Sequence, residues 1–128
     1  MIISFAWTAE ALLAGKKTVT RRCWKDSHAA KFKPGALHDA YDKIPIAGGK
    51  KIARVRIVSV MREPLDFFRN ADYAARELAL EGGLWESADQ FVKLFPPTCS
   101  RPWRVEFKLE SVENAGLPER SDSFTFAK

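Results

Sequence analysis

The amino-acid sequence predicts an α+β domain in which a small mixed β-sheet or β-barrel has two or three helices packed beside it. Two observations carry this prediction. Residues 53–58 and 103–110 alternate between inward apolar and outward polar side chains, as half-buried strands do. Between these segments the apolar spacing becomes that of a helix, and no regular strand–helix alternation runs through the chain.

The first half of the chain is expected to be mostly extended, with one short helix. Thr8 offers its hydroxyl as N-cap to a two-turn helix over residues 9–14, and Gly15 stands where such a helix ends. A Pro34-Gly35 pair predicts a turn. The expected strands are residues 2–6, 17–24 and 36–41.

The second half contains the two expected larger helices and the clearest strand pair. Residues 74–81 have helical spacing and end at Gly82-Gly83, and Ser87 to Gln90 has the form of a capping box that opens a second helix. Segments 53–58 and 103–110 are expected to pair, with opposite charges facing each other. We expect residues 1–112 to form one domain and residues 113–128 to be a polar C-terminal tail.

The charge is unevenly distributed along the chain. The formal net charge is +5, but residues 1–64 carry 13 basic and 5 acidic residues, whereas residues 65–128 carry 8 and 11. A basic surface of this kind is typical of proteins that bind nucleic acids, although a solvated face without function gives the same counts. The charge alone therefore leaves both interpretations open.

The remaining composition predicts a cytoplasmic protein without metal or cofactor. Cys23 and Cys99 are far apart in sequence, so neither a disulfide framework nor a zinc site is expected, and a reducing compartment fits best. His28 and His38 lack partners at metal-ligand spacing. No apolar stretch approaches the length of a membrane span, and a monomer is the favoured state.

The densest polar segment is Gly15-Lys16-Lys17-Thr18-Val19-Thr20-Arg21-Arg22. It is not a phosphate-binding P-loop, because Glu10 occupies the place of the first glycine and the segment follows a helix where a P-loop follows a strand.

Together with other segments, this one resembles the ASCH domain family over roughly residues 2–110. The matching segments are Ile3-Ser4-Phe5, residues 15–22, Phe32-Lys33-Pro34-Gly35, Arg56 to Val60, Glu81-Gly82 and Val105-Glu106-Phe107. The resemblance implies a PUA-like barrel with a cleft between barrel and helices, and an association with RNA or modified nucleosides. Some small bacterial members are similar to amidohydrolases that remove the acetyl group from N4-acetylcytidine with a Lys, a Thr and a Glu.

In this sequence the family's catalytic residues correspond to Lys17, Thr20 and Glu81, with Glu77, one helical turn earlier, as the competing choice for the acid. Residues of these three types can carry out amide hydrolysis together. A desolvated lysine near other cations has a lowered pKa and can act as a base toward the Thr20 hydroxyl, while a carboxyl group at a helix C-terminus is favoured in its protonated form. Strict strand alternation would send Lys17 and Thr20 to opposite faces unless Lys17 precedes the regular strand.

Further residues are candidates for substrate or RNA binding. Arg21, Arg22 and Lys25 are expected to hold phosphate or anchor the substrate, and Trp24 and Tyr41 to stack on a base. The other tryptophans considered, Trp7 and Trp103, are expected in the core.

Two alternatives to an amidohydrolase remain. A non-catalytic RNA-binding module would use the same basic strand on phosphates, and a single-strand ribonuclease would use Lys17, Arg21 and Arg22 on the scissile phosphate. The insertion at residues 44–51 and the doubled arginine favour a phosphorylated or polymeric substrate over a neutral nucleoside.

Overall fold

The computed structural model describes residues 1–113, and within them five strands form one mixed sheet in the order β1-β3-β4-β5-β2. The tail expected at residues 113–128 lies outside the described residues, apart from Glu113. Strands β1 and β3 are parallel and the other neighbours are antiparallel. The strands are β1 (Ile2–Ser4), β2 (Val19–Arg22), β3 (Leu37–Tyr41), β4 (Lys51–Arg62) and β5 (Trp103–Val112).

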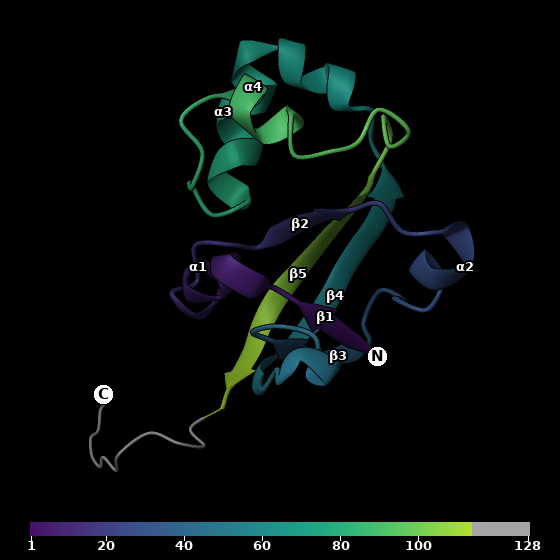
Figure 1. The fold of residues 1–128 in the computed structure, drawn as a ribbon, viewed down its shortest axis with the longest axis vertical. Coiled ribbons are helices and arrows are strands. Elements are labelled where there is room, and N and C mark those ends of the chain that lie inside the picture. Colours follow the sequence, from purple (N-terminus) through teal and green to yellow (C-terminus); the bar gives the residue numbers. More distant parts are fainter. Residues whose placement is uncertain (114–128) are drawn as a thin grey trace.

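Several short helices surround the sheet. The α-helices are α1 (Ala9–Leu13), α2 (Asp26–Ala29), α3 (Ala71–Leu80) and α4 (Ala88–Val92), and the 3-10 turns are η1 (Ala6–Thr8), η2 (Pro45–Ala47) and η3 (Leu65–Arg69). In Figure 1, α3 and α4 lie together beyond the end of β4, whereas α1 and α2 flank the sheet on opposite sides. The α+β class is therefore as predicted, and α2 is an element that the sequence patterns did not indicate.

The paired strands β4 and β5 form the centre of the sheet, as their alternation predicts. Val55 faces Leu109 and Ile57 faces Phe107 in the antiparallel register. The register shifts at two places along this pair, and such bulges increase the local twist of a sheet. The sheet therefore curls into a half-barrel.

The half-barrel is open between its edge strands, β1 and β2, which do not pair with each other among residues 1–113. A side chain spans this gap, because Arg22 Nη2 of β2 donates a hydrogen bond of 2.6 Å to the carbonyl oxygen of Ser4 in β1. The expected barrel is thus a curled sheet whose two edges are joined through a guanidinium group.

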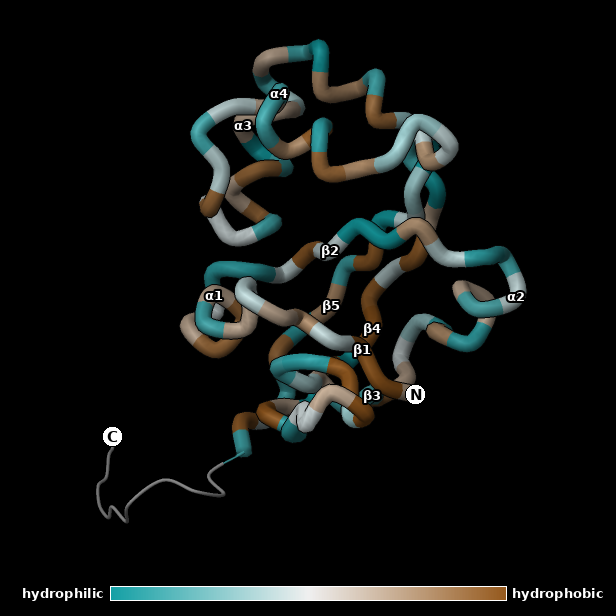
Figure 2. The backbone as a smooth tube through the Cα atoms, viewed as in Figure 1, coloured by the Kyte–Doolittle hydropathy of each residue, from teal (hydrophilic) through white to brown (hydrophobic). Residues whose placement is uncertain are grey.

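Within residues 1–113, two apolar clusters stabilise the fold. The sheet core consists of Ile3, Phe5, Leu12, Phe32, Ala40, Ala53, Val55, Ile57, Val105 and Phe107. The helical core consists of Phe68, Ala74 and Phe91 with partly buried neighbours. Figure 2 shows that β2, which faces the helical region, changes from hydrophobic to hydrophilic toward its end.

The helix boundaries follow from their caps. α3 begins three residues earlier than expected because the Asn70 side chain accepts a hydrogen bond of 2.8 Å from the backbone N–H of Tyr73. At α4, Ser87 caps the N–H of Gln90 as predicted, but the Gln90 side chain accepts from the N–H of Glu86. The second half of the capping box is therefore not formed.

The prediction that Thr8 caps α1 is wrong. Its hydroxyl donates a hydrogen bond of 2.6 Å to the carbonyl oxygen of Phe5, three residues back, and makes no cap hydrogen bond to the helix. Gly15 does adopt the left-handed conformation expected after the helix, with φ +77°.

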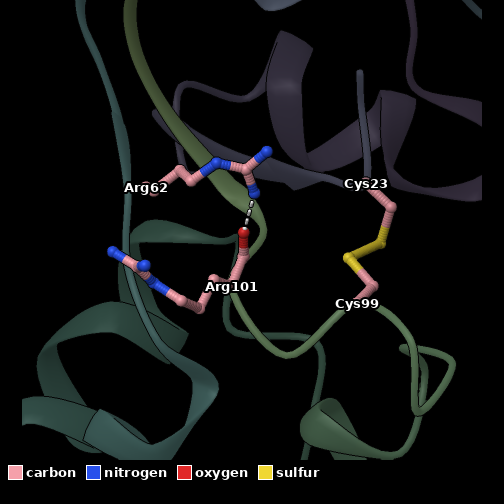
Figure 3. Close-up of a disulfide and its surroundings, with 4 residues drawn as sticks. All are labelled: Cys23, Arg62, Cys99 and Arg101. Atoms are coloured by element: carbon pink, nitrogen blue, oxygen red, sulfur yellow. Dashed lines mark hydrogen bonds between the residues drawn. A yellow bond between two sulfur atoms is a disulfide. The ribbon is translucent and has the colours of Figure 1, made fainter. Parts of the chain in front are cut away.

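The prediction that the cysteines are unpaired is also wrong, because Cys23 and Cys99 form a disulfide (Figure 3). They are 76 residues apart in sequence, but β2 and β5 pair with Arg22 opposite Trp103, which brings the end of β2 beside the segment before β5. Disulfides persist mainly in oxidising compartments, so this bond does not support the prediction of a reducing compartment. No helix within residues 1–113 is long and apolar enough to cross a membrane.

Candidate functional site

A cavity of about 320 Å³ lies between β2, the segment around η1, and the chain from the end of α3 to α4. We call it the Lys17 cavity. Its polar lining includes Lys17, Thr20, Arg22 and Glu81, and its aromatic lining includes Trp7 and Trp85. The three residues proposed from the sequence as a catalytic trio, Lys17, Thr20 and Glu81, therefore line the same cavity.

Lys17 reaches this cavity through a local strand pairing. It forms an isolated antiparallel bridge with Glu81, and the N–H of Thr18 donates to the carbonyl oxygen of Leu80 at 2.8 Å. Because β2 begins only at Val19, the side chain of Lys17 is not subject to the alternation of that strand. This removes the geometric objection to Lys17 and Thr20 lining the same space.

The Lys17 ammonium and the Glu81 carboxylate form a buried ion pair. Lys17 Nζ lies 2.8 Å from Glu81 Oε1 and 3.0 Å from the Glu81 carbonyl oxygen. The two residues are 3% and 1% exposed. Burial lowers the pKa of Lys17, and the nearby guanidinium groups lower it further, although the attraction of Glu81 opposes this shift. The neutral amine is therefore more accessible than in a surface lysine.

The Thr20 hydroxyl is held by the residue two positions along the strand. Thr20 is 3% exposed, and its Oγ1 accepts a hydrogen bond of 3.1 Å from Arg22 Nε. The two side chains share a face of β2, as alternation predicts. A cationic donor to the oxygen favours its deprotonated form and leaves the hydroxyl proton free to be donated.

Arg21, which lies between Thr20 and Arg22 in sequence, belongs to a buried network on the helical side of β2. Its guanidinium group donates to Glu81 Oε2 at 2.9 Å and to Glu77 Oε1 at 2.6 Å. The same group donates to Tyr73 and Glu63. Although burial alone would lower the pKa of Arg21, these acidic neighbours raise it. The carboxylate–guanidinium network consists of Arg21, Glu63, Tyr73, Glu77, Glu81 and Arg104.

The two glutamates that compete for the acidic role occupy different places. Glu81 contacts Lys17 and lines the Lys17 cavity, whereas Glu77 lies one turn away and accepts from Arg104 Nε at 2.7 Å. Burial tends to raise the pKa of Glu77, but hydrogen bonds from Arg104, Arg21 and Arg76 lower it to about 2. Glu77 is therefore a carboxylate at neutral pH and lies inside the network.

Three of the proposed binding residues do not line the Lys17 cavity. Trp24 stacks on Phe32 with ring centroids 4.4 Å apart. Lys25 precedes α2, and Tyr41 ends β3, where it pairs with Lys51. The structure thus brings together Lys17, Thr20, Arg21, Arg22 and Glu81, and it leaves Trp24, Lys25 and Tyr41 elsewhere.

Sequence reasoning missed two aromatic residues at this site. Trp7 was expected in the core, but it is 64% exposed and its ring meets that of Trp85 at 5.5 Å. The Gly82-Gly83 turn directly follows Glu81, and Trp85 comes soon after that turn. This closeness to Glu81 in sequence was the available indication that Trp85 lies at the site. For Trp7 the apolar neighbours in sequence pointed to burial.

A larger cavity, of about 710 Å³, lies between η3, α4 and the segment before β5. Its charged residues, such as Asp66 and Arg69, are exposed and pair with each other at 3.1 Å. It contains no buried reactive pair like that of Lys17 and Glu81, so the smaller cavity is the better candidate for chemistry.

Comparisons of this chain with protein-family models, with curated proteins and with solved structures found no match. Among residues 1–113 there is also no group of three or more His, Cys, Asp or Glu side chains suited to a metal ion. The chemical interpretation of the site therefore depends on its own residues and geometry.

Proposed function

We propose that this protein is an ASCH-type hydrolase with a PUA-like fold that removes the acetyl group from N4-acetylcytidine in the Lys17 cavity. The observation that carries the proposal is the buried contact of Lys17 with Glu81, which lie 64 residues apart in sequence, beside Thr20. Buried ionisable pairs at a cavity are common features of catalytic sites.

The proposed roles depend on where one proton lies in the hydrogen bond between Lys17 and Glu81. With that proton on Glu81, Lys17 is a neutral amine and takes the hydroxyl proton of Thr20 as Oγ1 attacks the amide carbon. Glu81 then protonates the cytidine nitrogen as the C–N bond breaks. Water next attacks the acetyl-Thr20 ester, its proton passes to Glu81, and Lys17 returns a proton to Thr20. The cycle releases cytidine and acetic acid and restores the starting state.

The oxyanion of the intermediate requires hydrogen-bond donors. The backbone N–H groups of Lys16 and Lys17 are not available, because both donate to the carbonyl oxygen of Ala11 at 3.0 and 3.1 Å. The donor in the proposed mechanism is therefore the Lys17 ammonium group, which forms when Lys17 has accepted the Thr20 proton.

The arginine contacts support a neutral substrate over a phosphorylated one. Arg21 is held by carboxylates, with its side chain 1% exposed, and Arg22 uses Nε and Nη2 on Thr20 and Ser4. Groups committed in this way contribute little to phosphate binding. The doubled arginine in the sequence is thus accounted for by internal contacts.

Release of acetate and cytidine from N4-acetylcytidine by the purified protein tests this proposal. Lys17→Ala, Thr20→Ala and Glu81→Gln are expected to lose turnover, while Lys16→Ala, which changes an exposed neighbour, keeps it. Thermal melts establish that each variant is folded. A folded wild-type protein without turnover contradicts the hydrolase, and RNA binding that weakens steeply with salt would then favour a non-catalytic RNA-binding module.

A further inference from the structure

Trp7 is an unusual residue for the mouth of a cavity, because its large apolar ring is 64% exposed. Ligand pockets are lined mainly by hydrophobic and aromatic side chains, so an exposed aromatic ring that lines a cavity is a candidate ligand contact. Its indole ring meets that of Trp85 at a centroid distance of 5.5 Å and an interplanar angle of 71°. The two rings thus form two walls of a corner, and both line the Lys17 cavity.

The backbone before Trp7 is strained in a way that accompanies this exposure. Among residues 1–113, Ala6 is the one non-glycine residue with a positive φ, +47°. Such conformations are costly for residues with a Cβ and are concentrated at functional sites. The strain lies at the bend where the chain leaves β1 and enters η1, immediately before Trp7.

Trp85, in contrast, is partly buried and packs against the helical core. Its ring packs edge-to-face on Phe91, 4.7 Å away, and Phe91 is buried in the helical core. Lys17 Nζ lies 6.0 Å from the Trp85 ring centroid. The corner is therefore fixed on one side and adjoins the reactive pair.

We propose that Trp7 and Trp85 form a stacking corner that binds the planar ring of a neutral nucleobase and presents its exocyclic amide to Lys17, Thr20 and Glu81. This inference rests on the proposed function and names the part of the substrate that is recognised. Indole faces stack on any aromatic base, and the cavity of about 320 Å³ is at the small end of the range for small-molecule sites. Trp7 and Trp85 act in binding and specificity and take no part in proton transfer.

The test measures binding and turnover separately. Cytidine and N4-acetylcytidine are titrated by calorimetry into Thr20→Ala protein, in which binding can be followed without hydrolysis. Adding Trp7→Ala or Trp85→Ala to this background is expected to raise Kd by about tenfold to a hundredfold, and the Phe variants to recover part of the affinity. Ile46→Ala, which removes another highly exposed apolar side chain on η2, is the matched control.

In the active protein, Trp7→Ala is expected to raise KM for N4-acetylcytidine with a much smaller change in kcat, as loss of substrate binding does. Turnover with unchanged KM and Kd in Trp7→Ala and Trp85→Ala would overturn the stacking corner and leave the hydrolase standing. Tryptophan-dependent binding of cytidine without hydrolysis would support the corner and contradict the catalytic proposal. Failure of the folded wild-type protein to bind either nucleoside would overturn the corner.

Discussion

The two apolar clusters of this protein differ in size and in what attaches them to the rest of the molecule. Within residues 1–113, the sheet core has ten buried residues drawn from four strands and the segments around them, whereas the helical core has three. The helical core is joined to the sheet by the carboxylate–guanidinium network and by the Cys23–Cys99 disulfide. The sheet region therefore depends on hydrophobic burial, and the helical region depends largely on polar and covalent links.

This difference matters for function because the Lys17 cavity lies at the boundary between the two regions. Thr20 belongs to β2 of the sheet, and Glu81 follows α3 of the helical region. Arg21 contacts both Glu81 and Glu77, so the network that attaches the helices also fixes the acidic residue of the proposed site. Conditions that loosen the attachment are expected to impair the site before they unfold the sheet.

The largest expected effect comes from removing the central carboxylate of the network. Glu77→Ala removes the buried carboxylate to which both Arg21 and Arg104 donate, and we expect the free energy of unfolding to fall by about 3–5 kcal/mol. Urea denaturation measures this change. Glu86→Ala, at an exposed position of the helical region, is the control and should change stability by less than about 0.5 kcal/mol. A loss below about 1 kcal/mol in Glu77→Ala would show that the network contributes little.

Acid is expected to weaken the same attachment. The pKa of Glu77 is about 2 in the folded protein, below its ordinary value of 4.5, so the unfolded chain binds a proton more readily between these values. Stability from this group is complete above about pH 5 and is lost as pH falls toward 2, by roughly 3 kcal/mol in total. Thermal melts across this range measure it. Glu77→Gln should flatten this part of the profile, and an unchanged profile in that variant would contradict the assignment.

Breaking the disulfide should have a similar or slightly smaller effect. Its reduction releases the segment before β5 from the end of β2 (Figure 3), and we expect a loss of about 2–4 kcal/mol. Amide hydrogen exchange should rise in α4 more than in β4. Melting with and without dithiothreitol measures the loss, and a Cys23→Ser/Cys99→Ser variant should not respond to the reductant. Equal melting temperatures of reduced and oxidised wild type would argue against a stabilising role.

The smallest expected effect is on the surface of the sheet. Arg56 Nε and Glu110 Oε1 are 2.7 Å apart, but both side chains are more than 40% exposed. Arg56→Ala should therefore lower the free energy of unfolding by no more than about 1 kcal/mol, as measured by urea denaturation. A larger loss would mean that surface charge pairs also stabilise the sheet, and the contrast between the two regions would be weaker.

The sequence predicts the sheet region better than the helical attachment, for a physical reason. Alternation of apolar residues is local information, and it correctly indicates that β4 and β5 pair. It cannot indicate that Cys23 and Cys99 meet, or that Arg21 is enclosed by carboxylates from α3, because these contacts depend on how distant elements pack.

The same limit applies to the candidate site. The resemblance in residues 15–22 and at Glu81-Gly82 pointed to side chains that do line one cavity. It gave no indication of the exposed ring of Trp7. Trp24, which was predicted because it follows the double arginine, and Tyr41, which was predicted because it lies near a glycine-rich turn, lie elsewhere. Position along the chain is a poor guide to which aromatic ring lines a cavity.

The most direct test of the central claim compares two substitutions of one residue. Thr20→Ser keeps a hydroxyl group and Thr20→Val keeps the shape of the side chain without it. The account predicts that the serine protein still releases acetate from N4-acetylcytidine, and that the valine protein is folded, binds cytidine and releases none. Undiminished acetate release by the valine protein would contradict the assignment of Thr20 as the nucleophile.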